Sequence, residues 1–209
     1  MARLPEEYKT TVPSGENAEE VVALIVACQL ADTGEADMSL DELIDDWHEL
    51  DLATEAVVVV APDGRIAGYA DVISRSYVTV SVYGYVHPDH RERGIGASIV
   101  AWGEHWTRDH IPQAPDNARV VVQHYVNAAN EGMRKLLEFV GYEPVRGVYV
   151  METELDKAPS ATGLARGHLR PRLRSRPGRV GGTRGCRGRL PGLVGTSSQY
   201  LRELCARDG

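Results

Sequence analysis

The segment from residue 78 to residue 106 constrains the fold most, because it joins a strand to a helix through a polar turn that contains two glycines. Residues 78–86 are rich in β-branched and aromatic side chains, which is typical of a strand. The turn runs from His87 to Gly96, and apolar residues then recur at helical spacing as far as Trp106. A strand, a turn and a helix in direct succession are therefore predicted here.

The turn has the chemistry of an anion-binding site. The first backbone N–H groups of a helix have no intrahelical acceptor and lie at the positive end of the helix dipole, so they bind phosphate groups. Gly94 and Gly96 allow a ligand to approach the backbone because they carry no Cβ, and Arg91 and Arg93 add positive charge. A solvated loop in front of a helix is the alternative, since such glycine spacing also arises by chance.

Two helices are predicted before this segment. Residues 18–30 carry apolar side chains at helical spacing after Asn17, which is a suitable N-cap. Ser39 and Glu42 have the capping-box spacing, and the apolar residues that follow mark one face of a second helix as far as Leu50. The opposite face of this second helix is acidic.

The remaining signals predict one more helix and a set of short strands. Asn130 can cap a helix over residues 131–140, which Gly141 ends, and the pair Asp63 and Gly64 favours a tight antiparallel hairpin. We therefore expect an α+β fold, with a mixed, mostly antiparallel sheet flanked by helices on both faces. The predicted strands cover residues 8–12, 55–61, 65–73, 78–86, 118–122, 142–145 and 148–154.

The charge is distributed very unevenly along the chain. The net charge is −7, but residues 1–155 hold 11 Lys and Arg against 27 Asp and Glu, a balance of −16. Residues 156–209 hold 12 against 3, a balance of +9. Such asymmetry indicates two segments of different role, which we place at residues 1–156 and 157–209.

The basic segment predicts a disordered tail. It is dense in Arg, Gly and Pro, and residues 157–195 contain no aromatic residue and no sustained apolar period, so they lack the means to form a core. Deleting residues 160–209 is then expected to leave the melting temperature almost unchanged. Two alternatives stay open: the arginines bind RNA or DNA through phosphates, or the tail is translated from a shifted reading frame and replaces a lost second repeat.

Several protein classes do not fit the composition. No run approaches the roughly 20 apolar residues of a membrane span, and the N-terminus lacks an apolar signal core, so we expect a cytoplasmic protein without a membrane anchor. Cys28, Cys186 and Cys205 are an odd number without redox or metal-ligand spacing. Neither a disulfide framework nor a metal site is therefore predicted.

Two motifs in the acidic part resemble the GCN5-related N-acetyltransferase (GNAT) superfamily over roughly residues 8–155. Arg91-x-x-Gly94-x-Gly96 after a strand is similar to the acetyl-CoA pyrophosphate loop of that superfamily, and Asn130-x-x-Met133 is similar to the start of its second motif. The end of this part looks most like the N-terminal half of tandem, mycothiol-synthase-like acetyltransferases.

The resemblance implies the GNAT fold and acetyl-CoA as co-substrate. It also implies that backbone groups of Tyr85 and Val86 bind the pantetheine arm, and that Asn130 lies near the thioester end, although Asn130 is equally a simple helix cap. The residues that would enclose the pyrophosphate are Arg91, Glu92, Arg93, Gly94, Ile95 and Gly96.

The groups for proton transfer are harder to assign. Acetyl transfer needs a base for the amine and a proton donor for the thiolate. The position that carries a Tyr acid in the family is Leu137, and the strand over residues 78–86 has no carboxylate. Tyr83 and His124 are the candidate catalytic residues, with a purely structural role as the alternative for each, and Asp71 on the neighbouring strand offers a base acting through water.

The sequence predicts an acetyl-CoA-dependent N-acetyltransferase that acts on a small amine, as a monomer or homodimer. The acidic domain favours a cationic amine, because its field attracts cations. A non-catalytic acetyl-CoA-binding module, left from a truncated tandem acetyltransferase, is the alternative, and a nucleic-acid-binding protein acting through the Arg-rich tail is the third.

Overall fold

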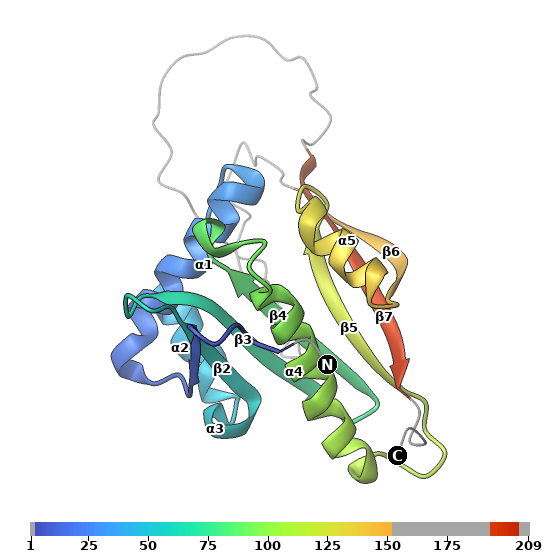
Figure 1. Ribbon diagram of the computed structural model, residues 1–209. Helices are drawn as coiled ribbons and strands as arrows, with labels where there is room; N and C mark the ends of the chain where they lie inside the picture. Colours follow the sequence, from blue (N-terminus) through green and yellow to red (C-terminus); the bar gives the residue numbers. More distant parts are fainter. Residues whose placement is uncertain (1–2, 152–192, 205–209) are drawn as a thin grey trace, which may run out of the picture. The chain divides into compact units, whose positions relative to one another are not determined.

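The structure is a computed structural model that describes residues 3–151 and 193–204 (Figure 1). The chain divides into two compact units, residues 1–149 with 195–209, and residues 150–194. Most of the second unit lies outside the described residues, so the fold below is that of the first. In chain order the elements are β1 (Lys9–Thr11), α1 (Ala18–Thr33), α2 (Leu40–His48), α3 (Leu52–Glu55), β2 (Ala56–Val60), β3 (Ile66–Arg75), β4 (Thr79–Val86), α4 (Ile95–His110), β5 (Val120–Asn127), α5 (Glu131–Phe139), β6 (Glu143–Met151) and β7 (Leu193–Leu204), with short 3-10 turns at Gly15–Asn17, Pro88–His90 and Ile111–Gln113.

Within the described residues, seven strands form one sheet in the order β1-β2-β3-β4-β5-β7-β6. Strands β1 to β4 pair antiparallel in succession, β4 and β5 pair parallel, and β5 and β7 pair antiparallel. Helices cover both faces, since α1 and α2 pack on one face of β2 and β3 and α4 packs on the other face of β3 and β4. The predicted α+β class, a mixed and mostly antiparallel sheet flanked by helices, is confirmed.

Local signals explain most of these boundaries. Ser39 and Glu42 form the predicted capping box, because the Ser39 hydroxyl accepts from the Glu42 N–H at 3.3 Å and the Glu42 carboxylate accepts from the Ser39 N–H at 3.2 Å. Gly64 turns the hairpin between β2 and β3 with φ +87°. Asn17 differs from prediction: its side chain accepts from the Ser14 N–H, so it closes the preceding 3-10 turn instead of capping α1.

The end of the acidic part also differs from prediction. We expected two short strands separated by a turn at residues 146–147, but a single strand, β6, runs from Glu143 to Met151. Gly147 is not among the glycines with positive φ in the described residues, so it continues the strand and does not turn it.

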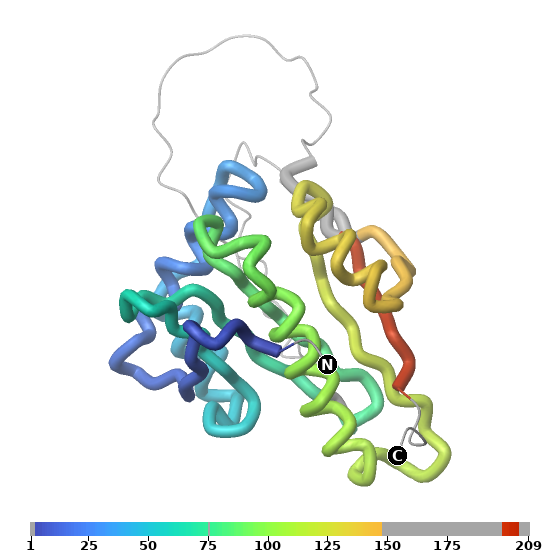
Figure 2. The backbone as a smooth tube through the Cα atoms, viewed as in Figure 1, coloured from blue at the N-terminus to red at the C-terminus, as the bar shows by residue number. Residues whose placement is uncertain are grey.

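The largest difference lies in the predicted tail. Residues 193–204 form strand β7, which lies along the whole of β5 from Val120 opposite Leu204 to Asn127 opposite Ser197. Figure 2 shows the later residues of β7, in red, beside β5, in yellow-green. Tyr200 and Leu204 are buried in the same cluster as β5, so this stretch belongs to the core and the prediction of a tail without packed structure is wrong for it. The rest of the predicted tail, residues 157–192 and 205–209, lies outside the described residues.

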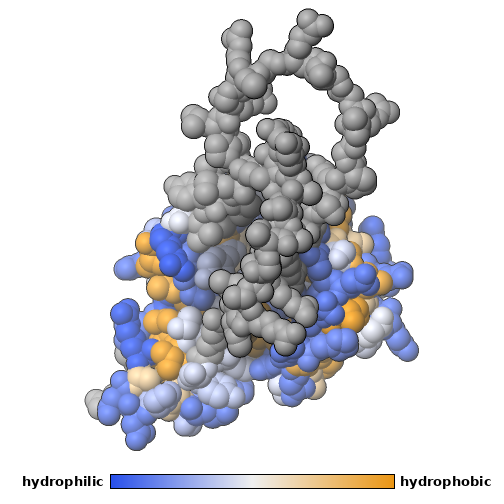
Figure 3. All heavy atoms as spheres, turned by 180° about the vertical axis from the view of Figure 1, so that it is seen from behind, coloured by the Kyte–Doolittle hydropathy of each residue, from blue (hydrophilic) through white to orange (hydrophobic). Residues whose placement is uncertain are grey.

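The described surface opposite α4 is mostly hydrophilic, with scattered hydrophobic residues (Figure 3). Among the helices in the described part of the chain, none combines the length and the apolar character needed to cross a bilayer.

Candidate functional site

The central feature of the site is a gap in the pairing of the two parallel strands. Strands β4 and β5 pair from Thr79 opposite Val121 to Val82 opposite His124 and then separate, although both strands continue (Figure 1). Beyond Val82, strand β4 pairs only with β3 among the described residues. Gly84 is exposed although it lies in a central strand. The β5 side of β4 therefore presents backbone groups to which an extended ligand can add as a strand.

The glycine turn lies beyond the end of β4 and begins α4. Gly94 is the N-cap of the helix with φ +82°, and Glu92 also has a positive φ of +61°, so the chain turns sharply at both positions. Gly94 is exposed and Gly96 is half-buried, so an anion can approach the backbone at these two positions of the helix start. Ile95 is 0% exposed as a whole residue and lies in the core, so the exposed Gly94 and the half-buried Gly96 are the positions of this helix start that can reach a phosphate.

Gly96 has a packing role in addition to the predicted one. A Cβ at this position would lie 3.3 Å from Cδ2 of Leu136 in α5, a distance tighter than ordinary van der Waals contact. The glycine thus allows the start of α4 to approach α5 closely. The two motifs that were predicted separately from the sequence are in direct contact through this pair.

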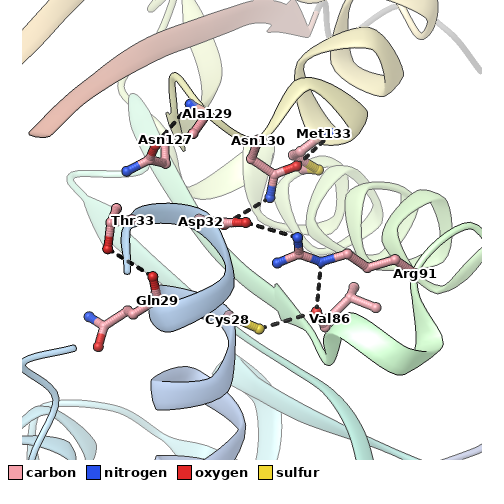
Figure 4. Close-up of polar contacts among 10 residues, drawn as sticks. All are labelled: Cys28, Gln29, Asp32, Thr33, Val86, Arg91, Asn127, Ala129, Asn130 and Met133. Atoms are coloured by element: carbon pink, nitrogen blue, oxygen red, sulfur yellow. Dashed lines mark hydrogen bonds and ion pairs between the residues drawn. The ribbon is translucent and has the colours of Figure 1, made fainter. Parts of the chain in front are cut away.

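The two arginines of the turn have different environments. Arg91 forms an ion pair with Asp32 of α1, with Nη1 to Oδ1 at 2.8 Å, and its Nε donates to the carbonyl of Val86 at 3.5 Å (Figure 4). Arg93 is exposed. It lines a shallow surface hollow of about 450 Å³ together with Arg65. Arg93 is thus the more available charge for a phosphate group, and Arg91 is shared with a carboxylate.

Asp32 connects three elements around the site (Figure 4). Its second oxygen, Oδ2, accepts from Nδ2 of Asn130 at 3.1 Å, while the side-chain oxygen of Asn130 accepts from the N–H of Met133 at 3.0 Å. Asn130 is therefore the predicted cap of α5 and also a link to α1. Sequence reasoning missed Asp32, and no local pattern at the end of α1 would have found it.

The backbone of Val86 is already engaged. Its carbonyl accepts from Sγ of Cys28 at 3.1 Å and from Arg91 (Figure 4). Burial raises the pKa of the Cys28 thiol to about 11, with Arg91 acting in the opposite direction, so the thiol stays protonated and donates. A ligand arm that binds the Val86 carbonyl would share or displace these donors.

The two candidate catalytic residues lie on opposite faces of the sheet. His124 is 2% exposed and packs edge to face on Tyr142, with ring centroids 5.0 Å apart, on the α5 side. Burial lowers the pKa of His124 to about 4, against a hydrogen bond with the Val82 backbone, so the ring is neutral at pH 7. Tyr83 is partly exposed on the α1 and α2 side and stacks on Tyr125 at 5.9 Å. Of the two, only Tyr83 lies on a face with solvent access.

Asp71 lies beside Tyr83, since the two residues are partners in the pairing of β3 and β4. Burial raises the pKa of the Asp71 carboxyl group to about 7, while a hydrogen bond with Tyr69 lowers it. The carboxyl group therefore titrates near neutral pH, which is where a general base is useful. Leu137, by contrast, is fully buried in the hydrophobic core and has no proton to donate.

A family model described as Acetyltransferase (GNAT) family matches residues 19–142, more than half of the chain. The chain is 48% identical to a GCN5-related N-acetyltransferase from Sphaerobacter thermophilus, with a TM-score of 0.72, over 76% of this chain and 50% of that one. It is 35% identical to an aminoglycoside N(6')-acetyltransferase type 1 of Klebsiella aerogenes over 60 residues, 25% of this chain and 40% of that protein.

A phosphinothricin acetyltransferase from Sinorhizobium meliloti, solved in complex with AcCoA, shares the fold with a TM-score of 0.60 at 14% identity, over 95% of this chain and 89% of that one. The chain thus spans about half of the Sphaerobacter protein and less than half of the Klebsiella protein. The family match covers the strand, the glycine turn and the Asn130 helix together, so the sheet described above is the GNAT fold. This chain belongs to the GNAT acetyltransferase family.

Proposed function

We propose that the protein is an acetyl-CoA-dependent N-acetyltransferase that acts on a small amine. The observation that carries the proposal is the separation of β4 and β5 after Val82 and His124, with the exposed start of α4 beyond it. A strand edge beside an anion-binding helix start suits a ligand with an amide-containing arm and a pyrophosphate. Acetyl-CoA has both, and it supplies the activated acetyl group when bound.

The residues of this chain have distinct roles in the proposal. The backbone from Tyr85 to Val86 binds the pantetheine arm, and the N–H groups from Gly94 to Gly96 bind the pyrophosphate. Arg93 adds an exposed positive charge, and Arg91 orders the turn through Asp32. Asn130 fixes the start of α5 near the point where β4 and β5 separate, through its hydrogen bond with the Asp32 carboxylate.

The class of acceptor is proposed from charge. The unit that carries the site is strongly acidic, so it attracts a cationic amine more than a neutral or anionic acceptor. The Klebsiella relative is named for an aminoglycoside, but the similarity covers a quarter of this chain. This similarity supports an amine as the acceptor and does not favour one amine over another.

Ligand-induced stabilisation tests cofactor binding. Acetyl-CoA at 100 times its Kd is expected to stabilise the protein by about 2.7 kcal/mol, because a ligand that binds only the native state shifts unfolding by mass action. Gly94→Asp is expected to reduce this affinity at least 100-fold, since it adds a side chain and a negative charge at a φ of +82° where the pyrophosphate lies.

Gly141→Asp is the matched control. Gly141 also has a positive φ, +91°, and open space around its Cβ direction, so the substitution adds the same strain and charge at the far end of α5. It should lower the melting temperature and leave acetyl-CoA affinity unchanged. Equal loss of affinity in both variants would contradict the assignment of the loop.

A non-catalytic acetyl-CoA-binding module is the second candidate. Leu137 favours it, because the position of the family's proton donor is an aliphatic side chain in the core. Release of free thiol from acetyl-CoA in the presence of a panel of primary amines separates the two candidates. Turnover with any amine supports the enzyme, and binding without turnover supports the module.

We also infer that the chain corresponds to the N-terminal half of a tandem, mycothiol-synthase-like acetyltransferase. Support comes from length, since the chain spans only 50% of its Sphaerobacter relative at 48% identity. Sequencing the genomic DNA through and beyond the codons for residues 155–165 tests it. A second acetyltransferase repeat in another frame supports the inference, and its absence contradicts it.

A further inference from the structure

The sheet face under α1 and α2 carries polar and aromatic side chains at the level where β4 and β5 separate. Asp71 of β3 is the register partner of Tyr83, and Tyr83 follows directly after Val82, the last residue of β4 that pairs with β5. Tyr83 stacks on Tyr125 of β5 with an interplanar angle of 12°, so this aromatic pair spans the opening. Asp71 thus lies one strand away from the point at which an acetyl group would be presented.

A buried hydrogen-bond chain fixes the carboxyl group of Asp71. The indole N–H of Trp47 in α2 donates to the hydroxyl oxygen of Tyr69 at 2.8 Å, and Tyr69 in turn is hydrogen-bonded to Asp71. Because the Tyr69 oxygen accepts from Trp47, its own proton is directed to the carboxylate. Trp47 and Tyr69 are 5% and 1% exposed, so both side chains are shielded from bulk water. A supported carboxylate beside an opening is the arrangement of an oriented base.

We propose that Asp71 accepts the proton of the acceptor ammonium group, directly or through one water, and that Tyr69 and Trp47 are the positioning residues that orient its carboxylate. This inference rests on the proposed acetyltransferase function. It assigns the base to β3, whereas the sequence of β4 offers no carboxylate. The acceptor is then a primary ammonium ion, because an anionic carboxylate beside the stacked pair of Tyr83 and Tyr125 favours a cation.

The proton and electron balance is complete without any other reagent. The ammonium group gives one proton to Asp71, and the free amine forms a C–N bond with the acetyl carbonyl carbon. The C–S bond then breaks, with its electron pair on sulfur. The thiolate takes the second proton from the same nitrogen, so a proton donor at Leu137 is not required. Asp71 returns its proton to solvent.

The groups that face Asp71 agree with this role. Burial is the largest influence and raises the pKa of its carboxyl group, the Tyr69 hydrogen bond lowers it, and the Asp46 carboxylate of α2 raises it. From β4, Tyr85 also faces the same charge, and burial raises the pKa of that phenol above its ordinary value. With a pKa of about 7, Asp71 is partly ionised at neutral pH and holds a transferred proton well.

The test uses the full chain and an alkyl diamine as acceptor. Asp71→Asn is expected to lower kcat/KM at least 100-fold and to leave acetyl-CoA affinity within twofold, while Asp71→Glu restores part of the activity. Asp109→Asn is the matched control, because Asp109 is an exposed acid near the end of α4 and should not affect either quantity. Unchanged kcat/KM in Asp71→Asn would overturn the assignment.

The pH profile separates positioning from simple stability. The kcat/KM of the wild type is expected to rise with pH and level off above about 7. Tyr69→Phe removes a hydrogen bond that lowers the pKa of Asp71. It should therefore shift the rising part of the kcat/KM profile to higher pH by roughly one unit. Tyr8→Phe also removes one phenol hydrogen bond, that to His90, and should leave the pH profile of kcat/KM unchanged.

The outcomes distinguish this inference from the proposed function. Failure of the wild type to bind acetyl-CoA, or to turn over any amine, contradicts the proposed enzyme and with it the role of Asp71. Normal turnover in Asp71→Asn, or an unshifted pH profile in Tyr69→Phe, contradicts only the role of Asp71. The proposed acetyltransferase function is then unaffected.

Discussion

The two faces of strands β3 to β5 differ sharply where the strands separate. The face under α4 and α5 is closed and mostly apolar, with Val80, Val82 and Val122 at most 1% exposed. The opposite face carries Asp71, Tyr83 and other polar groups, with partial exposure. Because successive residues of a strand point to opposite faces, one residue packs in the closed core and the next lies on the face of the candidate site. The comparison teaches that chemistry is confined to one side, and that the other side holds the strands in place.

Deleting β7 should reduce stability more than any other change considered, because this strand contributes side chains to both faces. Tyr200 joins the closed core, and Gln199 is hydrogen-bonded to Gln123 on the open face. Deleting residues 193–209 also removes every β5 partner on that side. We expect a loss of at least about 4 kcal/mol in the free energy of unfolding, from two large buried side chains and the ladder. Urea unfolding followed by circular dichroism measures it.

Tyr200→Phe is the control for this deletion. It keeps the ring in the core and removes only the hydroxyl contacts with Arg134 at 3.3 Å and Glu138 at 3.2 Å. The expected cost is about 1 kcal/mol. If the deletion costs no more than this substitution, β7 does not belong to the sheet and the predicted tail extends to the end of the chain.

Opposite pH dependence is the second prediction, since His124 on one face and Asp71 on the other have pKa values shifted in opposite directions. The pKa of His124 falls from 6.5 to about 4, so the folded protein binds fewer protons than the unfolded chain between these values. This contribution is present above pH 6.5 and is lost as the pH falls through about 4, by up to about 3 kcal/mol. The pKa of Asp71 rises from 3.8 to about 7, so its contribution is complete below pH 3.8 and is lost as the pH rises to 7, by at most about 4 kcal/mol.

Two substitutions measure these contributions separately by urea unfolding between pH 4 and 7. Relative to His124→Leu, the wild type should gain stability as the pH rises. Relative to Asp71→Asn, it should lose stability over the same range. Differences of the same sign would contradict the opposite directions of the two pKa shifts, and no difference would show that neither group changes its pKa on folding.

Asp32 gives the third and smallest prediction, because it joins the two sides across the opening. It belongs to α1, while its partner Arg91 lies in the turn before α4 and its partner Asn130 caps α5. Asp32→Ala removes two hydrogen bonds from a carboxylate that is 14% exposed, so we expect a loss of about 2 kcal/mol in the free energy of unfolding.

Asp63→Ala is its control, since the ion pair of Asp63 with Arg65 is exposed to solvent and should contribute much less to stability than the Asp32 cluster. If the two variants lose the same stability, the Asp32 cluster is no stronger than a surface ion pair.

Much of the fold was predictable because its signals are local. The capping box of Ser39 and the positive φ values of Gly64 and Gly94 each depend on a few neighbouring residues. The start of α4 was found in the same way. Strand β7 was not, because its pairing with β5 joins residues far apart in sequence and the Arg-rich segment before it carries no strand signal.

The candidate site divides along the same line. The positions of Arg91, Gly94 and Asn130 follow from motifs, but the sharing of Arg91 and Asn130 by Asp32 depends on contacts across 59 and 98 residues. The environment of Asp71 was equally hidden, since Trp47 reaches it only through Tyr69. The alternation of Tyr69 and Asp71 on one strand was the signal that could have paired them.

The position of β7 in the sheet has a consequence for synthesis of the chain. It lies between β5 and β6, two strands that the ribosome delivers earlier. The sheet therefore cannot close until residues 193–204 have left the ribosome, well after β5 and β6 have emerged. Until then, β5 presents an unpaired edge and the cluster that Tyr200 completes stays open. A slow, late step and a requirement for chaperones during synthesis are the expected cost of this order of strands.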